Sequence, residues 1–263
     1  MDLEYSQINF KGFEKIREEL EKITRYSNME TMYYRTNDIS HSKNVFYLLK
    51  ETMPKIRKTF PKFDEEKALV MAAIHDDAEI LIGDFQAGNK AKLTSEQLEE
   101  LNKKELEAIE KISQQYPKTI HNQLYKQLLL EVFHMNTIEA SVVKYLDRFD
   151  AFGESCHEVF AGNTAFTTPV ENEYGTIELP TPFYITRFND YEKNYPLIVE
   201  LIEKNQMPFL KKYMNIKIEN IVKNKKPHTA SSLLAQTNSL EYNFWKKTLI
   251  KHKLDKKLLI KIE

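Results

Sequence analysis

The chain has 263 residues, 41% of them hydrophobic, and its 38 basic and 39 acidic side chains leave a net charge of -1. This balance excludes a largely disordered chain, and 6 Gly and 9 Pro exclude a collagen-like or glycine-rich one. No apolar run approaches the ~20 residues of a membrane-spanning helix, and the first residues lack the layout of a secretory signal. We therefore expect a cytoplasmic protein with no membrane partner. Cys156 is the single cysteine, which excludes an intrachain disulfide or a thiolate metal cluster.

Helical patterns fill the first part of the chain. Apolar spacing predicts helices over residues 8–26, 40–53 and 64–82. The second should end at Pro54, because proline breaks a helix interior. Asp64 is the expected N-cap of the third helix and Gly83 its expected C-cap. The centre of this third helix is apolar almost all round, which is typical of a buried helix.

The pattern continues with helices predicted over residues 94–115, 120–135 and 137–160. Thr94 and Gln97 form a possible capping box, and Asn136 with Glu139 could cap the last of these helices. The sequence so far indicates an all-α fold.

After Gly162 the composition changes to Thr, Tyr, Phe and Pro. Residues 163–188 are predicted to be an insertion, either a long loop or a short hairpin that turns near residues 173–175. Helices resume over 190–205, and Trp245 anchors an amphipathic segment over 238–252. We expect one domain over 1–210 and a basic helical extension over 211–263. That extension carries 13 Lys against 4 acidic residues; we favour a solvated helix face over a nucleic-acid surface there.

Candidate metal ligands lie in three separate predicted helices. They are His41, the pair His75 and Asp76, and Asp147. Imidazole nitrogen and carboxylate oxygen are the usual side-chain ligands of a divalent transition metal where thiolates are absent. A buried helix that continues into His-Asp-Asp also needs something to neutralise Asp76, because an unpaired buried charge costs several kcal/mol. Each residue alone could instead be structural; Asp147 could pair with Lys144 in its own helix.

The order of these residues resembles the HD-domain metal-dependent phosphohydrolases, and within them the 5'-deoxynucleotidase branch. The resemblance covers about residues 7–162 and includes the segments RTNDISHS, HDDAEILIGD and TIEASVVKYLD. It implies an HD-domain helical bundle, a deoxynucleotide substrate, a homodimer and one divalent metal ion, which could be Mn, Co, Fe, Ni, Zn or Mg. We call the four residues that the resemblance assigns to this ion the metal-ligand set: His41, His75, Asp76 and Asp147.

Further residues match the branch's motifs. Glu79 follows His75 by four positions, on the same face of the predicted helix, and could orient the attacking water or shuttle its proton. Arg25 is a natural phosphate clamp because a guanidinium offers planar bidentate donors. The resemblance further implies that Tyr26, Asp84 and Lys90 contact substrate. Tyr26 stands where the branch usually has tryptophan, at the ribose 2' position, and Asp84 would accept from the 3'-hydroxyl. Asp77 is expected to be a structural or outer carboxylate.

Four functions remain open at this point. A deoxynucleoside 5'-monophosphate phosphatase is favoured, and a deoxynucleoside triphosphate hydrolase could use the same site. A nucleic-acid-directed phosphodiesterase that uses the basic extension is less favoured, and so is a non-catalytic binding module. His121 and His134 fall between the His-Asp pair and Asp147, where some HD enzymes hold a second metal ion; His134 fits a surface residue better.

Overall fold

The structure is a computed structural model. It describes residues 3–26, 36–84, 93–160, 163, 170–171, 177–178, 191–204 and 242–254. The chain divides into two compact units, one of residues 1–25 and 36–147 and the other of residues 26–35 and 148–263. The division falls inside one long helix, between Asp147 and Arg148. The described residues are mostly helical, as the sequence predicts.

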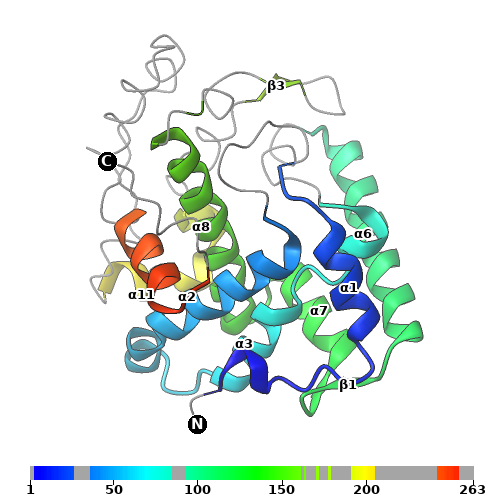
Figure 1. Ribbon diagram of the computed structural model, residues 1–263, viewed down its shortest axis with the longest axis horizontal. Helices are drawn as coiled ribbons and strands as arrows, with labels where there is room; N and C mark the ends of the chain where they lie inside the picture. Colours follow the sequence, from blue (N-terminus) through cyan, green and yellow to red (C-terminus); the bar gives the residue numbers. More distant parts are fainter. Residues whose placement is uncertain are drawn as a thin grey trace. The chain divides into compact units, whose positions relative to one another are not determined.

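The first unit is built from helices (Figure 1). They are η1 (Tyr5–Gln7), α1 (Glu14–Lys22), α2 (Asp38–Thr59), α3 (Glu65–Ile74), α4 (Glu79–Ile82), α6 (Ser95–Gln115), α7 (Tyr125–His134) and the first part of α8 (Ile138–Phe160). Helix α2 packs along both α1 and α3, and α7 packs against α3 and α6. Helix α3 is buried over its whole apolar length, residues 68–74, with at most 5% of any of these residues exposed. The metal-ligand candidates therefore follow directly from the centre of the core.

Several predicted helix ends are confirmed. Asp64 accepts a hydrogen bond from the Lys67 amide at the start of α3, and Gly83 ends α4 with a positive φ of 77°. Thr94 and Gln97 form the reciprocal capping box of α6. These caps depend on residues within four positions of each other, which explains why the sequence predicts them well.

Two predicted boundaries near the site are wrong. Helix α2 does not end at Pro54 but continues to Thr59, with Pro54 inside it. Met53 and Ile56 on either side of the proline are 5% and 0% exposed, and we attribute the continuation to this burial, which opposes the ~3 kcal/mol cost of an interior proline. The helix predicted over 64–82 is interrupted: α3 ends at Ile74, residues 75–78 form turns, and α4 begins at Glu79.

The start of the helix predicted over 120–135 is also wrong. Strands β1 (Thr119–Ile120) and β2 (Gln123–Leu124) form a small antiparallel hairpin, and α7 begins only at Tyr125. His121 and Asn122 at its turn have positive φ values of 44° and 64°, which no helix interior allows. At the start of α8, the Thr137 hydroxyl rather than Asn136 accepts the hydrogen bond from the Ala140 amide, at 3.3 Å.

The second unit contains the rest of α8. Its other described elements are β3 (Val170–Glu171), β4 (Ile177–Glu178), α10 (Tyr191–Asn194), η3 (Pro196–Ile198), α11 (Val199–Lys204) and a helix over 242–251. Strands β3 and β4 pair antiparallel, so the hairpin alternative for the insertion is confirmed. The predicted boundary between 210 and 211 lies outside the described residues and stays a prediction, as does most of the basic extension.

Trp245 holds the helix over 242–251 against the later part of α8. The indole is fully buried and donates from Nε1 to the Asp150 carboxylate at 2.7 Å. A Cβ atom on Gly153 would lie 2.4 Å from the indole ring, so only glycine fits there without a shift. Trp245 therefore acts as the apolar anchor that the sequence predicts.

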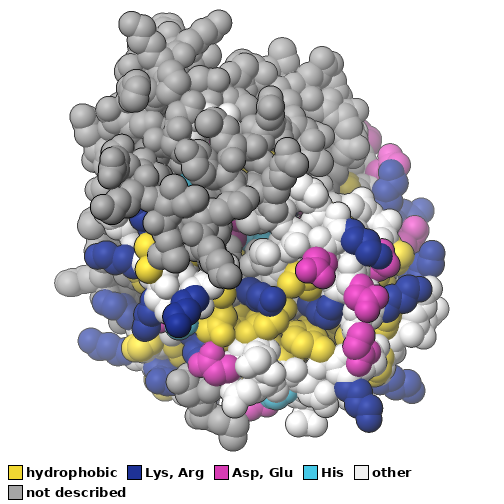
Figure 2. Space-filling view, in the orientation of Figure 1, with side chains coloured by type: hydrophobic (Ala, Val, Ile, Leu, Met, Phe, Trp, Pro, Cys, Tyr) yellow, Lys and Arg dark blue, Asp and Glu magenta, His cyan; other side chains and the backbone are white. Residues whose placement is uncertain are grey.

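The surface of the described part mixes charges of both signs. Figure 2 shows Lys and Arg side chains interspersed with Asp and Glu side chains on one face. On α6, for example, Lys104 lies 2.9 Å from Glu100 one turn earlier. Among the described residues, no helix is long and apolar enough to cross a membrane.

Candidate metal centre

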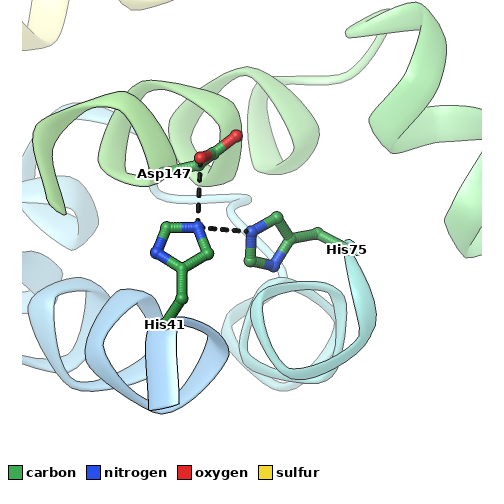
Figure 3. A group of neighbouring side chains, drawn as sticks. All are labelled: His41, His75 and Asp147. Atoms are coloured by element: carbon green, nitrogen blue, oxygen red, sulfur yellow. Dashed lines mark hydrogen bonds and ion pairs between the residues drawn. The ribbon is translucent and has the colours of Figure 1, made fainter. Parts of the chain in front are cut away.

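Three side chains from three helices converge in the core of the first unit (Figure 3). His41 comes from the first turns of α2, His75 from the residue after α3, and Asp147 from α8. The His41 Nε2 atom lies 3.2 Å from Asp147 Oδ1 and 3.3 Å from His75 Nε2. All three residues are buried, with at most 7% of any of them exposed. The structure thus brings together residues that are up to 106 positions apart in the sequence.

The hydrogen bonding of His75 fixes which nitrogen faces the group. His75 Nδ1 lies 2.9 Å from the Ala72 carbonyl oxygen. A carbonyl only accepts, so the proton sits on Nδ1 and the lone pair of Nε2 points towards His41. Burial lowers the pKa of His75 to about 4, which keeps the ring neutral at neutral pH. This is the tautomer and charge state in which an imidazole binds a metal ion.

Asp76 completes the predicted ligand set. Its Oδ2 atom lies 3.2 Å from His75 Nε2 and 3.6 Å from His41 Nε2. Burial would raise the pKa of Asp76, but the neighbouring histidines hold it below its ordinary value, so the carboxylate is charged. The Lys144 ammonium lies 2.6 Å from the other oxygen of Asp147, Oδ2, which leaves Oδ1 turned towards His41. The sequence reading named this lysine only as a structural alternative.

The donor set fits a divalent transition-metal ion. Two imidazole nitrogens and the Asp147 carboxylate converge, with Asp76 Oδ2 3.2 Å from His75 Nε2, and nitrogen with oxygen donors suits Mn, Fe, Co, Ni or Zn. The metal-binding role of these residues agrees with the geometry, while the identity of the ion stays open.

The interruption after Ile74 explains how adjacent residues reach the same point. In a continuous helix the side chains of His75 and Asp76 would diverge by about 100°. Because α3 ends before them, both stand on a turn, where their directions are not set by the helix.

A buried ion pair stabilises this turn, and the sequence analysis did not predict it. Arg17 on α1 forms an ion pair with Asp77 and donates to the Ala73 carbonyl oxygen at 2.8 Å, and Tyr125 donates to Asp77 at 2.9 Å. Asp77 is 0% exposed. Its predicted structural role agrees with these contacts.

Glu79 belongs to a group of carboxyl groups that includes Asp76. The ligand atoms of Asp38, Asp76 and Glu79 all lie within 4.8 Å of one another. Burial raises the pKa of Glu79 well above its ordinary value, and the charges of Asp76 and Asp84 raise it further. Burial and the charge of Asp76 raise the pKa of Asp38 to about 8. The sequence analysis did not single out Asp38, because an Asp in the first turn of a helix is common.

The predicted substrate residues are placed as follows. Arg25 is 7% exposed, and its charge opposes the raised pKa values of Glu79 and Asp84. Tyr26 is 2% exposed and donates through its hydroxyl to the Ala151 carbonyl oxygen at 3.0 Å. Lys90 lies outside the described residues. The roles of all four towards substrate stay predictions.

The two extra histidines do not join the site. His121 Nδ1 accepts from the Asn9 amide at 3.3 Å, and its Nε2 lies 3.7 Å from Glu66. His134 is exposed at the end of α7. Neither one belongs to a group of possible ligands among the described residues.

The mostly helical fold and a His, His-Asp and Asp set from α2, the turn after α3, and α8 are those of an HD-type phosphohydrolase. A solved structure is similar in fold: an HD-domain phosphohydrolase from Listeria innocua matches with a TM-score of 0.56 at 20% identity. The match covers 86% of this chain and 99% of that one. A conserved hypothetical protein from Pyrococcus furiosus matches with a TM-score of 0.43 at 21% identity, over 56% of this chain and 81% of that one.

The sequence narrows this class to one family. Residues 12–191 match the model of the YfbR-like 5'-deoxynucleotidase family. The chain therefore belongs to this family and is an HD-domain phosphohydrolase. A search of curated proteins finds no match. The matched range contains every predicted site residue from Arg25 to Asp147.

Proposed function

We propose that this enzyme hydrolyses deoxynucleoside 5'-monophosphates to the deoxynucleoside and inorganic phosphate. The observation that carries the proposal is the buried convergence of His41, His75 and Asp147 in a member of a 5'-deoxynucleotidase family. Asp76, 3.2 Å from His75 Nε2, supplies the fourth ligand.

The metal-ligand set would hold one divalent ion. When bound, such an ion lowers the pKa of a coordinated water and offsets negative charge on the phosphoryl group. The protein keeps the ligands ready for it: the Ala72 carbonyl orients His75, and Lys144 orients Asp147. Ligands oriented in this way bind a metal ion without a large loss of side-chain entropy.

Glu79 and Arg25 would act on the substrate. A carboxyl group with a raised pKa can carry a proton near neutral pH, so Glu79 suits either proton transfer or the orientation of the attacking water. The guanidinium of Arg25 would bind the phosphate oxygens through parallel hydrogen bonds. The positive charge of Arg25 would also offset the repulsion between the phosphate and the carboxyl groups of Glu79 and Asp84.

The test is a product analysis with purified protein in Mn²⁺. We expect inorganic phosphate from dAMP, less from AMP, and no phosphate from either with the Asp147→Asn variant. Release of triphosphate or pyrophosphate from dATP, without phosphate from dAMP, would assign the enzyme to triphosphate hydrolysis instead. Failure to act on mono-, di- and triphosphates with any of Mn, Co, Ni, Zn and Mg would refute both.

Tyr26 gives a separate test of sugar selectivity. If its ring crowds the ribose 2' position, Tyr26→Ala should raise kcat/KM for AMP relative to dAMP by about tenfold, because exclusion of a hydroxyl by shape is modest. Tyr26→Phe keeps the ring and removes the hydroxyl that binds Ala151, so it controls for lost stability. An unchanged ratio in Tyr26→Ala would remove this residue from the substrate site.

A further inference from the structure

A second group of possible ligands lies beside His41, His75 and Asp147, which we call the histidine group. It consists of Asp38 at the first position of α2, Asp76 on the turn after α3, and Glu79 at the first position of α4. One oxygen from each lies within 4.8 Å of the other two. The group therefore contains oxygen donors alone, and its Asp76 also belongs to the metal-ligand set.

Asp38 gives independent evidence that this group binds something. The residue is 0% exposed, and neither of its carboxylate oxygens has a hydrogen-bond partner among the described residues. The Oε2 atom of Glu79 is likewise buried without one. A buried carboxylate that lacks a partner costs several kcal/mol, and native proteins nearly always satisfy such groups. In its ionised form the Asp38 carboxyl group only accepts, so the partner that would satisfy that form is a hydrogen-bond donor or a cation.

The charges around the group favour a cation. Among the described residues, Arg25 favours the ionised forms of Asp38, Glu79 and Asp84, and one guanidinium balances only one of these three carboxyl groups. Asp76 lies beside His75, and Asp147 lies beside His41 and Lys144. In the part of the chain that the structure describes, the carboxyl groups on this side of the site thus outnumber the cations beside them, and a divalent ion would allow them to be ionised together.

We propose that Asp38, Asp76 and Glu79 form a second cation site, specific for a hard divalent ion such as Mg²⁺ or Mn²⁺. Oxygen donors select these ions, whereas the mixed nitrogen and oxygen donors of the histidine group suit Mn, Fe, Co, Ni or Zn. Asp76 has two carboxylate oxygens and can serve both sites. Glu79 contributes one oxygen and keeps the other for a water or a proton.

The proposal is tested by Mn²⁺ titration of the purified full-length chain without substrate, followed by electron paramagnetic resonance and metal analysis. We expect two Mn²⁺ per chain, with magnetic coupling between the ions through Asp76. Excess Mg²⁺ should displace one of them. Asp38→Asn should bind one Mn²⁺ tightly, and its affinity for the second should fall by about tenfold or more. The matched control, Asp64→Asn, keeps a capping residue far from the site and should bind two.

The outcomes separate this proposal from the proposed function, because no substrate is present. A wild-type chain that binds one Mn²⁺ at millimolar concentration would overturn it, and so would an Asp38→Asn variant that binds two coupled ions. If Asp38→Asn does not fold, Glu79→Gln provides the same comparison. Thermal unfolding offers a second readout: Mg²⁺ should raise the Tm of the wild type and of Asp64→Asn, and leave that of Asp38→Asn unchanged.

Discussion

Two buried histidines in different units show what distinguishes a candidate metal ligand from a histidine packed in a core. His75 is 7% exposed and His157 is 1% exposed, and burial lowers the pKa of each to about 4. His75 Nε2 faces His41 and Asp76. His157 instead has its Nδ1 atom 2.7 Å from the Tyr242 hydroxyl, and its ring lies 6.1 Å from that of Trp245.

The difference teaches that burial and a lowered pKa do not identify a ligand. The two histidines share both properties because both have lost water. What sets His75 apart is that other possible metal-ligand atoms converge on its Nε2 atom, from segments far apart in the sequence. His157 is surrounded by aromatic rings, and we interpret it as part of the packing between α8 and the helix over 242–251.

The largest expected effect comes from exchanging each histidine for alanine. His75→Ala should lose the bound ion and lower kcat/KM by about 10³-fold or more, because the ion supplies several kcal/mol of charge stabilisation. His157→Ala should keep the ion, and its kcat/KM should remain within about threefold of the wild-type value. Metal analysis and steady-state kinetics measure both. Equal metal content in the two variants would contradict the assignment of His75.

The next effect separates catalysis from metal binding. Glu79→Gln should retain the ion at the His41–His75–Asp147 group while kcat falls by about 10²- to 10⁴-fold, because an amide cannot exchange the proton. Glu66→Gln, at a partly exposed position on α3, is the matched control and should behave as wild type. Full turnover by Glu79→Gln would exclude the carboxyl group from proton transfer.

On the structural side of the comparison, Trp245→Ala should destabilise the protein by about 3–5 kcal/mol, the usual cost of removing a fully buried aromatic side chain. Gly153→Ala should also destabilise it, by about 1–3 kcal/mol, since its Cβ would clash with the indole. Urea unfolding gives both values. Metal content should not change in either variant; a loss of metal would mean that the two regions are energetically coupled.

The smallest effect is the pH dependence that His157 contributes. Its pKa is lower in the folded chain than the ordinary value of 6.5, so protonation favours the unfolded chain. This contribution is absent above pH 6.5 and destabilises the folded chain progressively as the pH falls towards 4. Relative to His157→Gln, the metal-free wild type should lose on the order of 2 kcal/mol between pH 7 and pH 4.5. Parallel stability curves would show that His157 is not kept neutral by burial.

Much of the site was predictable because metal binding depends on side-chain types that the sequence shows directly. Two histidines and two aspartates in a fixed order predict a metal site, and the segments around them predict the family. Asp38 and Arg17 were not predictable in this way. An Asp at a helix start is common as a favourable first-turn charge, and an Arg on an amphipathic helix is usually exposed. Only their contacts with residues from other helices distinguish them.

The sequence by itself determined the helical class, the caps at Asp64, Gly83 and Thr94, and the residues His41, His75 and Asp147 of the candidate metal centre. These features depend on neighbours within one or two turns, or on side-chain chemistry alone. Tertiary structure decided where α2 ends and where the chain turns between Ile74 and Glu79. It also decided which carboxylates share the space beside Asp76. Burial and charge at those places come from segments far away in the chain, so no local pattern carries them.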